Sequence, residues 1–204
     1  MSISSFTKYL IFFLLLSFTY NASANNKVEH KIAVLVNEEM ITSYDIIQRM
    51  KMNAIIKGIN INAQNNKLLL NNTVDDLIQE KLKKEKIEEY NIIIEDNEYK
   101  EFEIDFFERN KLNKAELKNI LENNNINFNE FKLLLLSELS WNKLINGLYF
   151  RLTSVSDSEV DEIISKNPNI SLNQAKNLVI QRQLDLKSSK LLRDMLNEAT
   201  IEYK

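Results

Sequence analysis

The chain has 204 residues and a formal net charge of −3, from 26 Lys and Arg against 29 Asp and Glu. A mildly acidic chain without a basic stripe is a poor nucleic-acid binder, so we expect no nucleic-acid partner. Cys is absent, and there are only two Gly and one Pro. The lack of Cys excludes disulfides, and the shortage of Gly and Pro disfavours β-sandwiches and barrels, whose many turns use these residues. The composition favours a mainly α fold stabilised by an apolar core.

The first 24 residues are typical of a secretory signal peptide. Lys8 gives a weakly positive start, residues 9–18 (YLIFFLLLSF) are an apolar core, and Ala22-Ser23-Ala24 is a small-x-small cleavage site. The alternative is an uncleaved N-terminal anchor, which the short apolar core and the adjacent cleavage site disfavour. No later stretch is apolar enough to span a membrane. We expect cleavage after Ala24 and one mature domain of residues 25–204.

Residues 32–52 (IAVLVNEEMITSYDIIQRMKM) predict a short β-hairpin that leads directly into a helix. Apolar residues precede a polar break at residues 37–39, and Met40-Ile41 resumes the apolar pattern. Thr42 and Asp45 then have the spacing of a capping box, and Gly58 is a plausible stop for the helix. Two strands alone are marginal in water, so this hairpin needs a third strand or a packed helix.

Further helices are predicted from apolar residues at helical spacing. The first follows a polar loop at residues 60–66, passes through Leu70 and Leu82, and has a charged outer face. The candidate N-caps of the later helices are Asp96, Asn113 with Glu116, Asn127 with Glu130, Ser156 with Glu159, and Ser171 with Gln174. The last helix carries Leu178, Val179, Leu192, Met195 and Leu196 at core spacing.

The chain ends with an alternating, β-prone stretch at Thr200–Tyr203. Backbone hydrogen-bonding groups need partners. We therefore expect this stretch to pair with residues 32–36 or with residues 40–42. The fold predicted is mainly α, with a small β-sheet formed by the N-terminal hairpin and a C-terminal strand. Residues 171–204 would then pack back on the N-terminal part as a helix and a strand.

These elements resemble the N-terminal domain of the SurA family of periplasmic chaperones. In that family a short hairpin containing the pair Val-Asn leads into a helix that opens on Ser-Asp; here the stretch is IAVLVNEEMITSYDI, with Asn37, Ile41 and Asp45 in the matching positions. Later patterns match in the same order, namely LIQEKL at residues 77–82, NIIIEDNE at residues 91–98 and VSDSEV at residues 155–160. The family's turn often contains Gly, so we expect Asn37 to adopt the left-handed conformation instead.

The resemblance implies a helical SurA N-terminal-like domain and a chaperone function. Family members usually continue into parvulin-type prolyl isomerase domains, but only Asn167–Ile170 separates the last matching pattern from the final helix. We therefore expect the parvulin domains to be absent. The implied protein is a periplasmic, ATP-independent chaperone that binds unfolded outer-membrane proteins or other exported polypeptides. It would prevent their aggregation without stable membrane insertion after signal cleavage.

No set of residues predicts catalysis. The one histidine, His30, lies near the start of the mature chain, and without Cys no ordinary zinc site can be assembled. Two Gly residues cannot make a phosphate-cradling loop. Because no nucleophile–base pair can be identified, we expect a protein that is not an enzyme and that has no catalytic, metal-binding or cofactor-binding residues.

Aromatic and methionine side chains supply the candidate peptide-binding residues. Aromatics at helical spacing most often fill the core, whereas those off the main apolar stripe can line a groove. Methionine adapts its shape to varied apolar partners. The candidates are Met40, Met50, Met52, Phe107, Trp141 and Tyr149.

Two other functions stay open at this stage. A non-chaperone helical scaffold or assembly partner in the periplasm would have a fully packed surface with one self-complementary patch, whereas a chaperone would expose an apolar groove. The second alternative is a degenerate foldase that acts with a separate isomerase.

We predict that protein recovered from the cell envelope begins at Asn25, because the cleavage site ends at Ala24. N-terminal sequencing of the purified protein checks this. An intact Met1 in the membrane fraction would contradict the prediction and support the anchor alternative.

Overall fold

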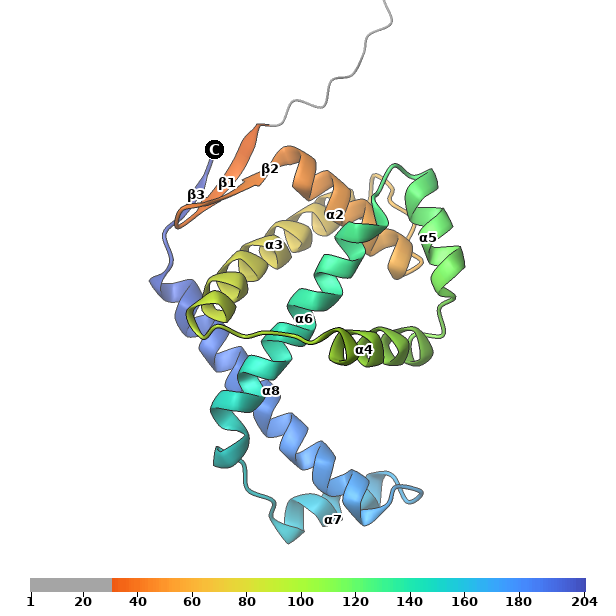
Figure 1. Ribbon diagram of the computed structural model, residues 1–204, viewed down its shortest axis with the longest axis vertical. Helices are drawn as coiled ribbons and strands as arrows, with labels where there is room; N and C mark the ends of the chain where they lie inside the picture. The colour runs from red at the N-terminus through yellow and green to blue at the C-terminus, as the bar shows by residue number, and fades with distance from the viewer. Residues whose placement is uncertain (1–30) are drawn as a thin grey trace, which may run out of the picture.

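The structure, a computed structural model, describes residues 31–204. The predicted signal peptide, its cleavage after Ala24 and His30 lie outside the described residues. In chain order the elements are β1 (Ile32–Val36), β2 (Glu39–Thr42), α2 (Ser43–Ile56), α3 (Asn66–Glu89), α4 (Asp96–Arg109), α5 (Lys114–Asn123), α6 (Phe128–Tyr149), the 3-10 helix η1 (Phe150–Leu152), α7 (Asp157–Lys166), α8 (Leu172–Glu198) and β3 (Ile201–Tyr203). The predicted mainly helical fold with a small sheet is confirmed (Figure 1).

The three strands form an antiparallel sheet in the order β2-β1-β3. Of the two predicted partners for the C-terminal strand, the structure selects residues 32–36. Asn37 follows β1 in the left-handed conformation expected of it, with φ 51°. Its backbone N–H donates to the Thr200 carbonyl at 2.8 Å, and its side-chain oxygen accepts from the Thr200 N–H at 3.0 Å. These two bonds fix the start of β3 against the hairpin turn.

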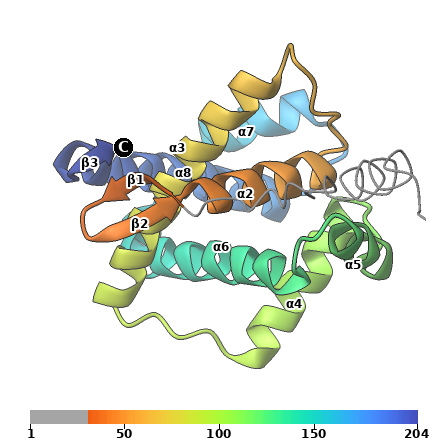
Figure 2. The same ribbon diagram turned by 90° about the horizontal axis from the view of Figure 1, so that it is seen from above.

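Helix α3 covers the inner face of the sheet, and the end of α8 packs beside it (Figures 1 and 2). Val34, Val36 and Ile41 supply the buried side chains of the strands. They pack in one cluster with Ile46 of α2 and with Leu77, Ile78 and Leu82 of α3. The hairpin therefore gains both of the supports that a two-stranded ribbon needs, a third strand and a packed helix.

Helix α6 runs through the middle of the molecule and contributes to two buried clusters. Its first half carries Phe128, Phe131 and Leu135, which pack with α4 and α5. The rings of Phe106, Phe107 and Phe131 lie with centroids 5.5–5.8 Å apart, in edge and tilted contacts that aromatic pairs prefer. Its second half carries Trp141, Leu144 and Ile145, which pack against Leu184 of α8.

Helix α7 and the first part of α8 form an arm that projects away from the remaining helices (Figure 1). Its small core consists of Val160, Ala175 and Val179. Leu178 was predicted at a core position, but it is exposed, because α7 covers only one side of α8 here. The arm joins the body at Gln183, whose side chain donates to the Ser154 carbonyl and accepts from the Ser154 N–H.

Most of the predicted helix caps are confirmed by side-chain hydrogen bonds. Capping boxes form at Thr42 with Asp45 and at Ser171 with Gln174, and the side chains of Asn113 and Ser156 accept from the predicted N–H groups. Two details were wrong. Glu95, not Asp96, is the N-cap of α4, and the Asn127 side chain accepts from the Asn129 N–H rather than from the Glu130 N–H. The bond that closes this turn of α4 runs from the Glu95 backbone N–H to the Glu98 carboxylate, at 2.8 Å.

We predict that residues 168–204 are required for folding. Val179, Leu184 and the half-buried Met195 pack into three separate clusters, and a fully buried side chain of this kind contributes about 1.5–3 kcal/mol. The total stability of a domain is only about 5–15 kcal/mol. Thermal unfolding should show no cooperative transition for a chain that ends at Asn167, and a lowered midpoint for a chain that ends at Ala199 and lacks β3. A chain ending at Asn167 that melts at the full-length temperature would contradict this architecture.

Glu39, at the start of β2, connects the hairpin to α3. Its carboxylate accepts hydrogen bonds from Lys84 at 2.8 Å and from Lys81 at 3.0 Å. These bonds, with the positive charge of the two ammonium groups, lower the pKa of Glu39 from 4.5 to about 2. Because the side chain is 43% exposed, water screens much of this attraction.

We predict that Glu39→Gln lowers the free energy of unfolding at neutral pH by less than about 1 kcal/mol. A lowered pKa in the folded state stabilises the fold above the unfolded pKa and ceases to do so as the pH falls through the folded value. The difference between wild type and variant should thus be full above about pH 4.5 and vanish toward about pH 2. Denaturant unfolding across this range measures it. Glu38→Gln, at the exposed neighbouring position, is the matched control and should lack this pH dependence; an identical profile would contradict the role of Glu39.

Candidate functional site

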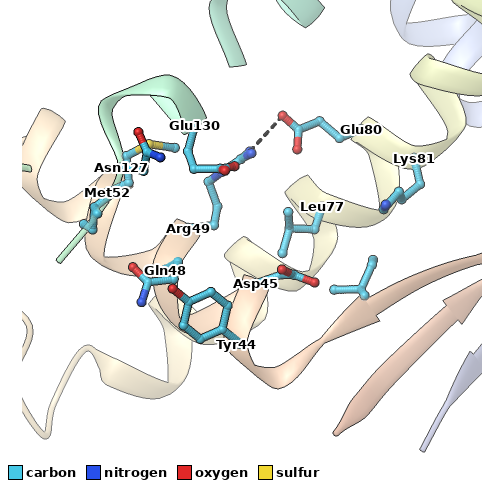
Figure 3. A pocket seen from close by; sticks show the side chains of 12 residues that line it. Tyr44, Asp45, Gln48, Arg49, Met52, Leu77, Glu80, Lys81, Asn127 and Glu130 are labelled. Atoms are coloured by element: carbon cyan, nitrogen blue, oxygen red, sulfur yellow. Dashed lines mark ion pairs between the residues drawn. The ribbon is translucent and has the colours of Figure 1, made fainter. Parts of the chain in front are cut away.

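A pocket of about 440 Å³ lies between α2 and α3, and β2 and the start of α6 complete it (Figure 3). We call it the α2–α3 pocket. On α2, side chains spaced by three or four residues face one side of the helix. This places Tyr44, Gln48 and Met52, and with them Asp45 and Arg49, along one wall. The opposite wall comes from Leu77, Glu80 and Lys81 of α3, and Ile41, Ile126, Asn127 and Glu130 complete the lining.

The charged groups of the α2–α3 pocket are largely paired with one another or with neighbours. The Arg49 guanidinium and the Glu80 carboxylate lie 2.8 Å apart across the pocket, and both side chains are mostly buried (Figure 3). Lys81 binds Glu39, as described above. The Asp45 carboxylate accepts from the backbone N–H and the hydroxyl of Thr42. Neither cation is therefore available for an anionic ligand without breaking an existing pair.

Two acceptors of the pocket have no such partner. The Oε1 atom of Gln48 is buried, and no hydrogen bond to it is formed. The Glu130 carboxylate, in the first turn of α6, makes neither a hydrogen bond nor an ion pair within the part of the chain that the structure describes. A buried acceptor without a donor costs free energy, so Gln48 marks a place where a donor would stabilise the protein.

A second, more apolar hollow lies between the start of α4 and the exposed side of α6. We call it the α4–α6 groove; its volume is about 530 Å³. The apolar lining consists of Ile94, Tyr99, Leu133 and Leu136, and the polar lining of Glu95, Asp96, Asn129 and Lys132. Leu133 is 58% exposed and Leu136 also faces solvent. Solvent-exposed leucines that line an open groove are available to an apolar partner.

Two hydrogen bonds from Lys143 hold the α4–α6 groove in shape. The ammonium of this α6 residue donates to the Ile93 carbonyl at 2.9 Å and to the Glu98 carboxylate at 2.7 Å, which ties the start of α4 to α6. Burial, with the nearby Glu103 carboxylate, raises the pKa of Tyr99 to about 12. The Tyr99 phenol therefore stays neutral at physiological pH and presents no charge to the groove.

The six residues predicted to bind peptides do not lie together. Met50, Met52, Phe107 and Trp141 are buried, Tyr149 is half-buried against α8, and Met40 is exposed on β2. Phe107 and Trp141 fill the core, which is the commoner place for aromatics at helical spacing. Phe107 packs against Phe131, and the indole N–H of Trp141 donates to the Ser188 hydroxyl, because helices cover α4 and α6 on those sides. Met52 alone of the six lines the α2–α3 pocket, and none lines the α4–α6 groove. A binding role for these residues stays a prediction.

The groove leucines were missed although the sequence contained a signal for them. Residues 133–136 are four consecutive leucines. Successive residues of a helix point about 100° apart, so four in a row cannot all face one core. Leu135 is buried, whereas Leu133 and Leu136 are exposed. The run therefore indicated that α6 would present apolar side chains outside the main core.

The described residues offer neither a metal site nor a membrane span. Within residues 31–204, no three His, Cys, Asp or Glu side chains gather closely enough to hold a metal ion. Over the same residues, none of the helices combines the length and the apolar character needed to cross a bilayer. The α2–α3 pocket and the α4–α6 groove are two of the concave surfaces that the described side chains form, and the groove is the more apolar of the two.

Comparison with known proteins gives a family for this chain. A family model described as the SurA-like N-terminal domain matches residues 2–145. Comparison with curated protein sequences gives no match. Among solved structures, one match comes from a study of two structurally related SurA-like chaperones of Campylobacter jejuni, the virulence factor PEB4 and the periplasmic protein Cj1289. The matched chain from that study is 16% identical in sequence to the present chain. The match covers 85% of the present chain and 98% of the matched chain, with a TM-score of 0.44.

Proposed function

We propose that this chain, which belongs to the SurA-like N-terminal domain family, is a periplasmic, ATP-independent chaperone. It binds unfolded segments of outer-membrane proteins and prevents their aggregation. The family gives the general role of binding unfolded polypeptides, and the signal-like residues 1–24 support export. The client class follows from the family resemblance and from the kind of surface that the chain offers.

The observation that carries the proposal is the α4–α6 groove. Leu133 and Leu136 lie at i and i+3 on one side of α6, and the groove is completed by Tyr99 of α4 and by Ile94, which precedes that helix. Each Å² of apolar surface removed from water contributes about 25 cal/mol, so apolar client side chains gain free energy by entering the groove. Non-directional contact of this kind suits a chaperone, because it places little demand on the client's sequence.

The groove can also distinguish among apolar segments by shape. Tyr99 contributes an aromatic ring, and rings of the client can pack against it in edge or offset contacts. Extended segments of membrane β-barrels alternate apolar and polar residues. A groove with apolar walls and with polar groups at Asn129 and Lys132 accommodates both kinds of side chain. We propose that binding requires neither nucleotide hydrolysis nor proline isomerisation, in keeping with the absence of a phosphate-cradling sequence and of a parvulin-like sequence segment.

We predict that the double variant Leu133→Gln with Leu136→Gln loses most of the aggregation-suppressing activity of the protein. Both side chains line the groove, and both are exposed, so their replacement should leave the unfolding temperature nearly unchanged. The measurement is light scattering after an unfolded β-barrel client is diluted from urea into buffer with the chaperone. A several-fold higher chaperone concentration should be needed for half suppression.

Ile104→Gln is the matched control, because Ile104 is also 58% exposed but lies on α4 outside the groove lining. It should suppress aggregation as well as the wild type. Equal loss in the control and the double variant would contradict a specific role of the groove. Failure of the wild-type protein to suppress aggregation at any ratio would contradict the chaperone proposal and favour the periplasmic scaffold.

A further inference from the structure

The α2–α3 pocket differs from the groove in the ligand that it suits. Its interior combines an apolar floor, formed by Ile41, Met52 and Leu77, with polar groups at the rim. Three acids and two bases line it, namely Asp45, Glu80 and Glu130 against Arg49 and Lys81, so the lining carries one net negative charge. The two groups without a partner, the Gln48 amide oxygen and the Glu130 carboxylate, are both hydrogen-bond acceptors.

We propose that the α2–α3 pocket binds a basic side chain, Arg or Lys, of an extended client polypeptide. The inference rests on the proposed chaperone function and adds a second, charge-selective contact to it. Arg and Lys carry apolar stems below a charged head. The stem lies on the floor between Met52 and Leu77, and the head donates hydrogen bonds to Gln48 and Glu130.

The existing pairs exclude other classes of ligand. An anionic side chain would face the net negative lining, since Arg49 is already held by Glu80 and Lys81 by Glu39. A purely apolar side chain would fill the floor but leave the Gln48 oxygen buried without a donor. A guanidinium or ammonium supplies donors and positive charge together, which matches both of the unpartnered groups.

The Arg49–Glu80 pair gives the pocket its form. The 2.8 Å contact joins α2 to α3 and holds the Glu80 carboxylate on Arg49 (Figure 3). The acceptors left for an incoming cation are those of Glu130 and Gln48. Gln48 and Glu130 come from different elements, α2 and α6, on either side of the pocket.

The test is the binding of a fluorescein-labelled peptide amide, Gly-Gly-Arg-Gly-Gly, measured by fluorescence polarisation with the full mature protein. The same peptide with citrulline in place of arginine is the neutral control, because citrulline keeps the shape and loses the charge. The arginine peptide should bind more tightly than the citrulline peptide, and added salt should reduce the difference. Equal binding of the two peptides would overturn the proposal.

Two variants locate the contact. Glu130→Gln should weaken binding of the arginine peptide roughly two- to fivefold, as expected for an exposed charge pair. Gln48→Met should weaken it roughly two- to tenfold without lowering the unfolding temperature, because it removes a buried acceptor that has no partner. If Gln48 had only a structural role, Gln48→Met would lower the unfolding temperature.

Glu138→Gln is the matched control for Glu130→Gln, because Glu138 is an exposed acid elsewhere on α6. It should bind the arginine peptide as the wild type does; equal weakening in this control would overturn the assignment to the α2–α3 pocket.

The outcome separates this inference from the proposed function. A wild-type protein that suppresses aggregation through the α4–α6 groove but does not prefer the arginine peptide would overturn the inference and leave the chaperone function intact. Preference for the arginine peptide without aggregation suppression would support the pocket and contradict the chaperone. Tighter binding of free L-argininamide than of the arginine peptide would overturn the polypeptide as the source of the cation.

Discussion

The pairing of β3 with β1 is the constraint on which the rest of the fold depends. A strand of five residues and a strand of four cannot hold a hairpin in water by themselves. The third strand comes from the far end of the chain, and its junction is fixed by two hydrogen bonds between Asn37 and Thr200. Because β3 follows α8 directly, this pairing also determines where α8 ends. Helix α8 then lies against α3 and α6, and the N-terminal and C-terminal parts form one packed body.

Helix α6 belongs both to that packed body and to the α4–α6 groove. Phe131, Leu135 and Leu144 are buried on its inner side, whereas Leu133 and Leu136 face the groove beside α4. A helix that buries one side in the core exposes apolar residues on another side only where no neighbouring helix covers them. The tie from Lys143 to Glu98 and to the Ile93 carbonyl keeps α4 at the distance that leaves this space. Core packing and groove formation are thus two consequences of the same helix placement.

The two concave surfaces follow from different physical causes. The groove is apolar because α6 carries more leucines than its core can bury. The α2–α3 pocket is polar because two helices meet through an ion pair, Arg49 with Glu80, instead of through apolar side chains alone. The charged groups of Arg49 and Glu80 are partners of one another, whereas the buried Gln48 oxygen of the same pocket has no hydrogen-bond partner.

The sequence by itself determined the class of fold and much of its local structure. Helix starts at Thr42, Asn113, Ser156 and Ser171 were predictable because a cap is a short-range hydrogen bond between residues two or three apart. The C-terminal strand was predictable from its alternating pattern and from the hairpin's need for a third strand, and the left-handed Asn37 was predictable from the family's glycine in this turn. The four leucines at residues 133–136 could also have indicated an exposed apolar face on α6.

Only the tertiary structure decided which apolar residues are available to a partner. Phe107 and Trp141 are aromatic residues of the kind that binding surfaces use, but both are buried. Phe107 of α4 is covered by α5 and α6, and Trp141 of α6 is covered by α8. Leu178 has core spacing but is exposed, because α7 covers one side of α8 only. The α2–α3 pocket joins residues from β2, α2, α3 and α6 that are up to 89 positions apart. Periodicity fixes the direction of a side chain relative to its own helix, and burial depends on which other helices arrive there.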